Sequence, residues 1–467
     1  MQKKQLPYKY FFFDLLASLI VWVLFVVFRK YINNYSLFQD FRVLFPGHDY
    51  LTSLLLFPLC CTFVHYLTGF YLNALKHSKV LIFSSTFVSA LIISVSVFLS
   101  TMLRDVTVSH QYFYASMFVL FVLFFSVTFI VRTIIYSQVR KKFLTNTWTI
   151  NTLIIGANSH ATKIANDLQK FALYNTFVGF VTTNKNNNEL VNDVLGNISQ
   201  IGNIITTHEI KEVIIVLDDK ATEQQLFNIV NLLYNFDVEI QFTPRLYEIL
   251  TGSAKISNLG IIPLVNITRS TMPNWQISVK RFFDFAASAF SLFVLFPFLF
   301  YVAIRIKLDS KGPIFYKQER IGRFGKPYKI LKFRTMKIDS ESGVPKLSNA
   351  FDNRITKYGK ILRKYRIDEI PQFWNILKGE MSLVGPRPER KYYINEIIKV
   401  APYYCLLYKI RPGLTSWGPI KIGYADTVDK MVERLNYDII YLEDMSLFND
   451  FKILIYTFEI IVKGKGI

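Results

Sequence analysis

The chain has 467 residues, of which 51% are hydrophobic and 16% aromatic, and its formal net charge is +20. This length predicts two or three domains. So large an apolar fraction with so strong a positive charge argues against an ordinary soluble protein. It indicates a membrane protein that works against anions, either lipid headgroups or phosphorylated substrates. The sequence carries no nucleic-acid-binding motif, so nucleic acid is not expected as a partner.

Four long apolar stretches come first in the chain. Each approaches or exceeds the ~20 residues that a helix needs to cross the hydrocarbon core, and none shows amphipathic periodicity. They are Tyr10–Phe28, Leu51–Leu72, Val80–Leu103 and Tyr112–Tyr136. We therefore expect residues 1–145 to form a region of four transmembrane helices.

Basic residues mark one side of these helices. They lie before the first stretch, between the second and third, and after the fourth: Lys3, Lys4, Lys9, Lys76, Lys79, Arg140, Lys141 and Lys142. The loops on the other side also carry aspartates, which dilute their positive charge. Because basic loops stay in the cytoplasm, the N-terminus and everything after Arg140 are expected on the cytoplasmic side.

Residues 146–270 alternate strand-like and helix-like stretches, which predicts a Rossmann-like α/β domain with a parallel sheet. The expected elements are the helix Ala161–Phe171 and the strands Thr149–Ile155, Thr176–Val181, Val213–Leu217 and Val238–Phe242. The turn after the first strand keeps only Gly156 of the dinucleotide fingerprint, and no acidic residue ends the second strand. We therefore favour a regulatory or scaffolding domain over a cofactor-binding one.

A fifth apolar run, Val279–Lys307, has basic residues at both ends and Pro297 near its centre. Basic residues at both ends favour both ends on the same side of the membrane. Proline breaks the helical hydrogen-bond ladder, as a hairpin dipping into one leaflet requires. We expect residues 279–307 to form a re-entrant membrane helix at the start of a domain covering residues 275–467.

Three absences narrow the chemistry of the basic region after Ser310. It has no histidine, no Asp-x-Asp pair and no phosphate-binding loop with Gly-Lys-Ser or Gly-Lys-Thr. These absences exclude a His–Ser or His–Cys catalytic pair and a P-loop nucleotidase there. What remains is carboxylates among arginines and lysines, which suits phosphoryl transfer through a metal and a carboxylate nucleophile.

The densest stretch of such residues is Arg363–Gln372, which is followed by Gly379–Pro388. The adjacent acids Asp368 and Glu369 would ordinarily be a solvated helix start, where they complement the helix dipole. Here several cations precede them and a rigid Pro-Arg-Pro sequence follows. This setting favours a catalytic pair.

Ordered motifs in the last 190 or so residues resemble those of the monotopic phosphoglycosyl transferases, also called bacterial sugar transferases. The matching segments are Lys332–Met336, Asp368–Gln372, Lys378–Pro388, Arg411–Thr415 and the region Tyr437–Leu447. The transmembrane region and the α/β domain are similar to those of the larger members, the polyprenyl-phosphate hexose-1-phosphate transferases. The resemblance also implies that the fifth apolar run is re-entrant. Members often carry serine before the kink proline, whereas this chain has Phe296.

The resemblance implies a two-step reaction that initiates exopolysaccharide, capsule or O-antigen synthesis. Asp368 would attack the β-phosphate of a UDP-sugar and expel UMP, and undecaprenyl phosphate would then take the sugar phosphate from the enzyme. Glu369 would hold Mg²⁺ as the metal ligand. This chemistry implies a multi-pass protein of the bacterial inner membrane, with the catalytic domain on the cytoplasmic face and membrane lipids as partners.

The same resemblance implies the substrate-binding residues. Arg387, flanked by Pro386 and Pro388, matches a phosphate- or nucleotide-binding position, and a guanidinium suits bidentate phosphate contacts. Lys332 matches another active-site cation, and Arg334 belongs to the same motif. Arg363 aligns with a basic residue near the acidic pair, although contact with lipid headgroups explains it equally well. The apolar stretch Phe451–Val462 fits either the membrane interface or a packed core.

Two other functions remain open from the sequence. A nucleotide-sugar dehydratase or epimerase would use the α/β domain, but it needs an intact glycine fingerprint and a Tyr-x-x-x-Lys pair, which the domain lacks. A non-enzymatic scaffold of a polysaccharide assembly complex fits the first 265 residues and gives no reason for the later motifs. The sequence does not determine which sugar is transferred, which polysaccharide pathway the protein serves or which oligomeric state it adopts. A homo-oligomer is among the states left open.

Overall fold

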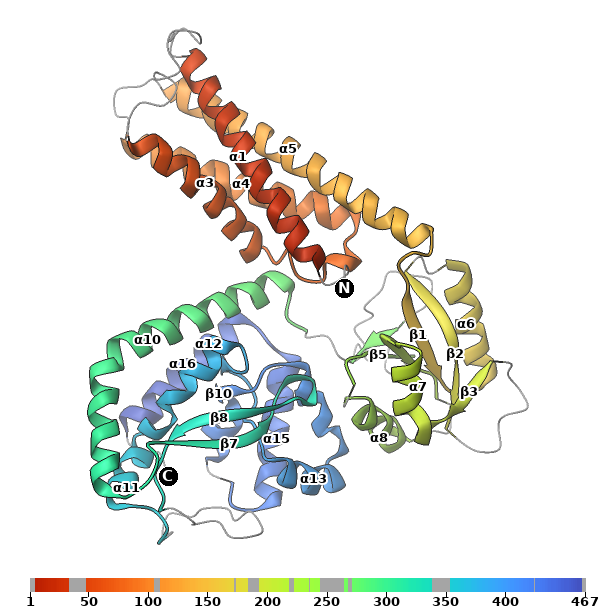
Figure 1. Cartoon of the computed structure of the whole chain (residues 1–467), viewed down its shortest axis with the longest axis vertical. Coiled ribbons are helices and arrows are strands. Elements are labelled where there is room, and N and C mark those ends of the chain that lie inside the picture. Colours follow the sequence, from red (N-terminus) through yellow and green to blue (C-terminus); the bar gives the residue numbers. More distant parts are fainter. Residues whose placement is uncertain are drawn as a thin grey trace. The chain divides into compact units, whose positions relative to one another are not determined.

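The computed structural model describes residues 5–32, 48–104, 110–171, 174–183, 193–217, 222–234, 236–243, 264–267, 271–337, 353–423 and 425–463. The chain divides into two compact units, one made of Met1–Thr147 and Pro273–Phe282 and the other of Trp148–Met272 and Phe283–Ile467. One long helix, α10, contributes residues to both units. Figure 1 shows the elements of each unit and labels most of them.

A helical bundle makes up most of the first unit. Helix α1 packs against α3 and α5, and α4 packs against α5. The helices are α1 Leu6–Ile32, α3 His48–Leu67, α4 Lys79–Arg104 and α5 His110–Leu144. Helices therefore form at all four predicted apolar stretches. Among the described residues α1, α4 and α5 are long and apolar enough to cross a membrane, whereas the described apolar part of α3, Ser53–Leu67, is shorter.

A buried ion pair joins the helices of the bundle. Nε and Nη2 of Arg132 donate to the two carboxylate oxygens of Asp14 at 2.9 and 2.7 Å. Two more side chains complete this cluster. Thr86 accepts a hydrogen bond from Nη1 of Arg132, and the hydroxyl of Tyr71 donates to Asp14. The guanidinium also lies 3.6 Å from the centre of the Phe70 ring. Satisfying both charges in this way is what lets them be buried among apolar helices.

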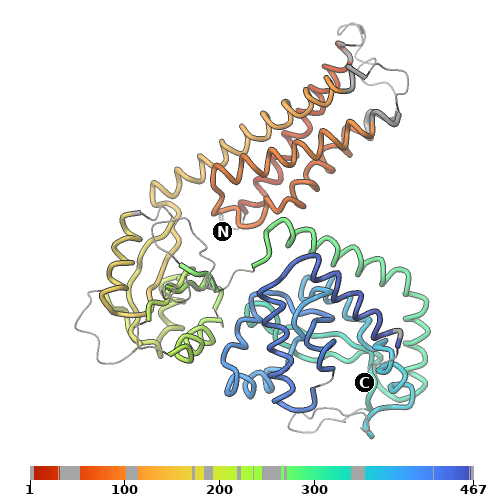
Figure 2. Tube along the Cα trace, turned by 180° about the vertical axis from the view of Figure 1, so that it is seen from behind, coloured from red at the N-terminus to blue at the C-terminus, as the bar shows by residue number. Residues whose placement is uncertain are grey.

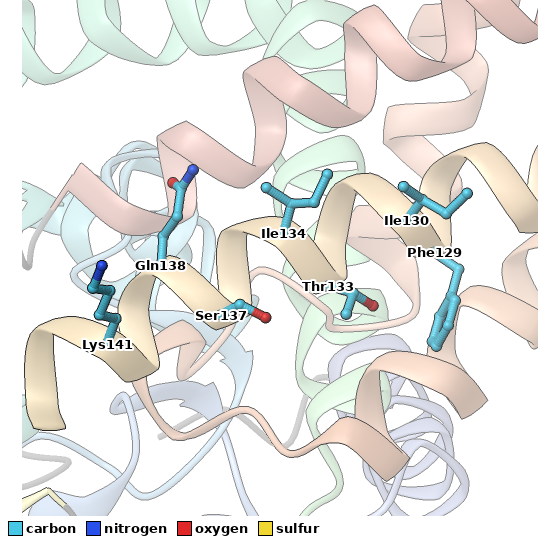
Figure 3. Close-up of a pocket in the computed structure, with 7 residues that line it drawn as sticks. All are labelled: Phe129, Ile130, Thr133, Ile134, Ser137, Gln138 and Lys141. Carbon is cyan, nitrogen blue, oxygen red and sulfur yellow. The ribbon is translucent and has the colours of Figure 1, made fainter.

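Helix α5 carries a shallow, largely apolar groove of about 420 Å³ along one face. Its lining changes along the helix from apolar to polar residues (Figure 3). The lining residues are Phe129, Ile130, Thr133, Ile134, Ser137, Gln138 and Lys141. Gln138 accepts a hydrogen bond from Nζ of Lys9, so this end of the groove is tied to α1.

The α/β part of the second unit contains a sheet with the order β3-β2-β1-β4-β5-β6. The first five strands are parallel and β6 is antiparallel. This order is that of a Rossmann-like sheet. The strands are β1 Ile150–Ile155, β2 Asn175–Thr182, β3 Val194–Asn197, β4 Glu212–Ile215, β5 Glu239–Phe242 and β6 Val265–Asn266, and the helices are α6 Ser159–Phe171, α7 Ile201–Thr207 and α8 Glu223–Leu233.

The predicted strands and helix of this domain are confirmed to within two residues at each end. The prediction omitted the short edge strands β3 and β6, which are only half-buried. Gly156 follows β1 with φ of 124°, and a Cβ there would lie 2.0 Å from the carbonyl oxygen of Val216. Glycine at this turn is therefore explained by the close approach of a neighbouring strand. Asn158 caps α6 by accepting a hydrogen bond from the backbone N–H of Ala161.

The C-terminal part of the second unit combines short helices with two small sheets. Strands β7 and β8 are antiparallel, and β9 and β10 are parallel. The elements are β7 Phe315–Ile321, η4 Arg323–Gly325, β8 Pro327–Phe333, α11 Lys357–Lys364, η5 Ile367–Gln372, α12 Phe373–Lys378, β9 Ser382–Val384, α13 Lys391–Val400, η6 Pro402–Lys409, β10 Gly413–Thr415, α14 Trp417–Ile422, α15 Val428–Glu443 and α16 Leu447–Val462. Element η6 packs on α8, where Asn231 donates to the carbonyl of Pro402.

Helix α10, Asn274–Asp309, coincides with the fifth apolar run and has Pro297 in its interior. The helix bends sharply partway along its length (Figure 1, Figure 2). Proline removes one backbone donor and clashes with the preceding turn, which is the usual cause of such a bend. Aromatic side chains cover its exposed surface, among them Phe290, Phe293 and Phe296. The whole helix is also long enough to cross a membrane, so the re-entrant course remains a proposal.

Candidate active site

The hairpin of β7 and β8 directs Lys332 toward the acidic pair. Side chains alternate along a strand, so Tyr328, Ile330 and Lys332 share one face of β8. The first two are buried, and η5 packs on β8. The ammonium Nζ of Lys332 lies 2.7 Å from Oε1 of Glu369. The strand therefore delivers a cation to a carboxylate 37 positions later in the chain.

Asp368 and Glu369 lie in the first turn of η5, directly after a change of chain direction. Arg366 adopts the left-handed conformation, with φ of 53° and ψ of 24°, so the chain leaves the direction of α11 there. Leu362 of α11 and Phe333 of β8 are buried in one cluster, which fixes the approach to this turn. Both acidic residues are only 8% exposed.

Glu369 is surrounded by cations. Its Oε1 lies 2.7 Å from Nζ of Lys332 and 3.3 Å from Nη2 of Arg387, and its Oε2 lies 3.7 Å from Nη1 of Arg366. Burial disfavours the ionised carboxylate, but Lys332, Arg387 and Arg366 together outweigh burial and lower the pKa of Glu369 well below its ordinary value. Glu369 is therefore a permanent anion that gathers these cations around the site.

Asp368 differs from its neighbour in its electrostatic environment. Burial raises the pKa of this carboxyl from 3.8 to about 6, against the attraction of Lys332. The negative charge of Glu369 contributes to this rise, while Arg363 and Arg387 oppose it. A carboxylate with a raised pKa is more basic than an ordinary aspartate and stays largely ionised at neutral pH. Such a group is suited to nucleophilic attack.

The structure brings Arg363 to the acidic pair and does not bring Arg334. The charge of Arg363 acts on Asp368, and its Nε donates to Thr335 Oγ1 at 2.9 Å. Strand β8 ends one residue before Arg334, and the NH2 group of Arg334 donates instead to the carbonyl and hydroxyl of Ser310, at 2.6 and 2.9 Å. In this structure Arg334 thus anchors the residue that follows α10, and its role in substrate binding stays a prediction.

The segment after β9 presents Arg387 to the same cluster. Pro386 and Pro388 are buried on each side of the half-buried Arg387. The segment lies against the start of β10, where a Cβ on Gly413 would come within 2.1 Å of the backbone nitrogen of Gly385. The N–H of Gly413 also donates to the carbonyl of Pro386 at 2.9 Å. Glycine at both positions permits this contact, and the prolines restrict the backbone around Arg387.

Sequence reasoning did not assign several residues that shape this site. Arg366 was part of the dense stretch, and its spacing of three residues from Glu369 could have identified it as an ion-pair partner. Three others hold the segment around Arg387 from distant parts of the chain: Asp284, Arg434 and Asp438. No local pattern signals these contacts, because they depend on how α10 and α15 pack.

The donor set suits a Mg²⁺ ion shared with a substrate. Mg²⁺ is usually held by one or two carboxylates, with phosphate and water oxygens completing its coordination. Asp368 and Glu369 offer such a pair, and the described residues contain no cluster of three or more His, Cys, Asp or Glu side chains. Oε2 of Glu369 faces only the more distant cation of its group, at 3.7 Å. Glu369 therefore fits the expected role of metal ligand.

Comparison with known proteins gives two family matches. Residues 275–464 match the family described as bacterial sugar transferase, and residues 64–244 match a family described as CoA-binding domain. The exopolysaccharide production protein PSS of Rhizobium leguminosarum bv. phaseoli is 38% identical over 202 residues, which cover 41% of this chain and 99% of that protein. The chain belongs to the bacterial sugar transferase family.

Two longer relatives share this family region. The UDP-N-acetylgalactosamine-undecaprenyl-phosphate N-acetylgalactosaminephosphotransferase of Aeromonas hydrophila is 34% identical over 49% of this chain and 53% of that protein. The UDP-glucose:undecaprenyl-phosphate glucose-1-phosphate transferase of Escherichia coli K12 is 31% identical over 57% of this chain and 58% of that protein. The matched part of this bacterial sugar transferase thus spans little more than half the length of these relatives.

Proposed function

We propose that this bacterial sugar transferase moves a sugar 1-phosphate from a UDP-sugar to undecaprenyl phosphate and releases UMP. The observation that carries the proposal is the difference between the adjacent carboxyls. Glu369 is held as an anion by Lys332, Arg387 and Arg366, whereas Asp368 is buried beside them with a raised pKa. One carboxylate organises the positive charge and the other remains available for bond formation. The names of the relatives point to the same donor and acceptor classes.

The proposed reaction has two steps. In the first, a carboxylate oxygen of Asp368 bonds to the β-phosphorus of the UDP-sugar. The bond between that phosphorus and the bridging oxygen breaks, and UMP leaves with the oxygen. In the second, a phosphate oxygen of undecaprenyl phosphate bonds to the same phosphorus, and the carboxylate of Asp368 is released. The product is a polyprenyl diphosphate sugar, and the two steps give ping-pong kinetics.

The cations around the site reduce the repulsion between reacting anions. Donor, nucleophile and acceptor are all negatively charged, so fixed positive groups must offset that charge in the transition state. Lys332 and Arg387 already point into the cluster, and the planar guanidinium of Arg387 can contact two phosphate oxygens at once. Mg²⁺ held by Glu369 would add charge neutralisation at the diphosphate.

We also propose that the site works at the cytoplasmic face of the bacterial inner membrane. UDP-sugars are soluble and undecaprenyl phosphate is a lipid, so both must reach one site at the membrane surface. A re-entrant course of α10 would hold the catalytic residues on the side where Lys280, Arg281, Arg305 and Lys307 lie. The bend and the interior Pro297 support that course over a straight crossing.

The test is a radiolabel experiment with the purified full chain in vesicles that contain undecaprenyl phosphate. A panel of UDP-sugars labelled in the sugar is screened for UMP release and for transfer of label to the lipid. The proposal expects both products in a one-to-one ratio for at least one donor. It also expects label on the protein when the lipid acceptor is omitted. Release of UDP, or label on the lipid without UMP, would contradict it.

A further inference from the structure

A buried carboxylate of α10 holds the strand that leads to Arg387. Oδ2 of Asp284 accepts a hydrogen bond from the hydroxyl of Ser382 at 2.7 Å, and Oδ1 accepts one from the backbone N–H of Leu383 at 3.0 Å. The residue is 3% exposed. Both oxygens therefore bind the same short strand, β9, four and five residues before Arg387.

Other buried groups hold the chain on the far side of Arg387. Glu389 pairs with Arg434 of α15 and with Arg320 of β7, and Arg320 also donates to the carbonyl of Pro388 at 3.0 Å. The buried carboxylate of Asp438, also on α15, interacts electrostatically with the backbone N–H of Arg387 itself. The segment 382–389 is thus fixed from α10, β7 and α15.

Burial of these charges is expensive, which makes their placement informative. Taking an aspartate out of water is costly unless hydrogen bonds replace those to solvent. Asp284 receives two such bonds from β9, and their geometry fixes the strand along its length and across it. A hydrophobic side chain at 284 could fill the space, but it could not fix the position of the Leu383 backbone.

We propose that Asp284 is a positioning residue for Arg387, and that it sets where the guanidinium meets the diphosphate of the donor. This inference rests on the proposed function and adds a residue of the membrane helix α10 to it. Because Asp284 lies on α10, the geometry of the segment 382–389 depends on how that helix packs against β9. Asp284 acts through β9 and does not itself touch the substrate.

The experiment measures UDP binding and UMP release by the full-length chain in the same vesicles. The variants are Asp284→Ala, the nearly isosteric Asp284→Asn, Arg387→Ala and the double variant Asp284→Ala/Arg387→Ala. The exposed Glu433→Gln on α15 is the matched control for loss of an acidic side chain. Thermal inactivation and vesicle association of each variant are recorded, so that general damage is visible.

The expected result is a loss that depends on Arg387. Asp284→Ala should weaken UDP binding and lower kcat/KM by about 10- to 100-fold. Loss of a residue that orients a binding group typically has an effect of this size. In the Arg387→Ala background, Asp284→Ala should lower kcat/KM and UDP affinity by less than about twofold, because there is no guanidinium left to position. Glu433→Gln should leave both quantities unchanged.

Four outcomes would overturn the inference. They are unchanged UDP binding in Asp284→Ala, an equal loss in both backgrounds, wild-type behaviour of both Asp284 variants, and a loss that simply follows vesicle association. If Asp284→Ala fails to fold, Asp284→Asn replaces it in the double-mutant cycle with Arg387→Ala. A wild-type chain that binds UDP in an Arg387-dependent way but releases no UMP would refute the proposed function and leave the positioning test intact. A wild-type chain that does not bind UDP would refute both.

Discussion

Asp368 and Glu369 are adjacent and equally buried, yet their pKa values move in opposite directions. The cause is the geometry of the cations. Lys332, Arg366 and Arg387 converge on Glu369, whereas Asp368 experiences the negative charge of Glu369 and the same loss of solvent. Groups in one site whose environments separate their pKa values generally have separate tasks.

Asp368→Asn should abolish UMP release and at the same time stabilise the protein. In the folded state the Asp368 pKa is raised from 3.8 to about 6, so the native protein binds more protons than the unfolded chain between these values. Stability contributed by this group therefore falls as pH rises through that window, and the cost is complete above pH 6. Removing the charge should recover about 1–3 kcal/mol near pH 7.5.

Thermal inactivation midpoints in detergent at pH 7.5 and near pH 4 test this gain. The gain should be present at the higher pH and should be much smaller at the lower one, where the folded carboxyl is protonated and the unfolded one is close to its ordinary pKa of 3.8. Asp429→Asn, an exposed position on α15, serves as the matched control and should show little gain at either pH. A lower midpoint for Asp368→Asn at pH 7.5 would show that the ionised Asp368 does not destabilise the folded protein.

The pH dependence of kcat/KM should show one ionisation near pH 6, with activity falling on the acid side. Only the ionised carboxylate of Asp368 can attack, and kcat/KM reports ionisations of the free enzyme. Lys332 is the largest attractive contribution that opposes the raised pKa. Lys332→Met should therefore move the acid limb to higher pH. The measurement is initial UMP release between pH 4.5 and 8.5, and an acid limb that stays in place after this substitution would argue against Asp368 as the titrating group.

The sequence located the helices and strands directly, whereas the contacts that build the site come from distant parts of the chain. Hydrophobic runs and strand alternation located the apolar helices and the main strands, because these patterns depend on neighbouring residues. The bonds of Arg334 to Ser310 were not predicted, since a motif does not reveal that β8 ends just before Arg334 and that Ser310 is near. The sequence analysis assigned no role to Asp284, which lies near the start of an apolar run. Its role depends on contact with a strand almost a hundred positions away.

Arg334→Ala and Arg387→Ala should therefore have different effects. Arg387 points into the cationic cluster, so its loss should lower kcat/KM for the UDP-sugar by about 10²–10³-fold. Arg334 bonds to Ser310 at the end of α10, so its loss should lower the thermal inactivation midpoint and leave KM near the wild-type value. Steady-state UMP release and thermal inactivation, measured on the same preparations, separate the two effects. A raised KM without loss of stability in Arg334→Ala would indicate that Arg334 binds substrate.

Glu369→Gln should destabilise the protein, in contrast to the substitution at its neighbour. The low pKa of Glu369 means that its anion contributes stability at neutral pH, and this stability is lost as pH falls below the ordinary carboxylate range. Without it, Lys332, Arg387 and Arg366 would repel one another in a partly buried site. Removing one member of a buried ion pair typically costs about 3–5 kcal/mol. Part of that loss should be recovered in Glu369→Gln/Lys332→Met, since this double variant removes both charges of the 2.7 Å pair. A double-mutant cycle on thermal inactivation measures the coupling. If the two losses simply add, Glu369 does not gather the cations, and the contrast between the two carboxylates needs another explanation.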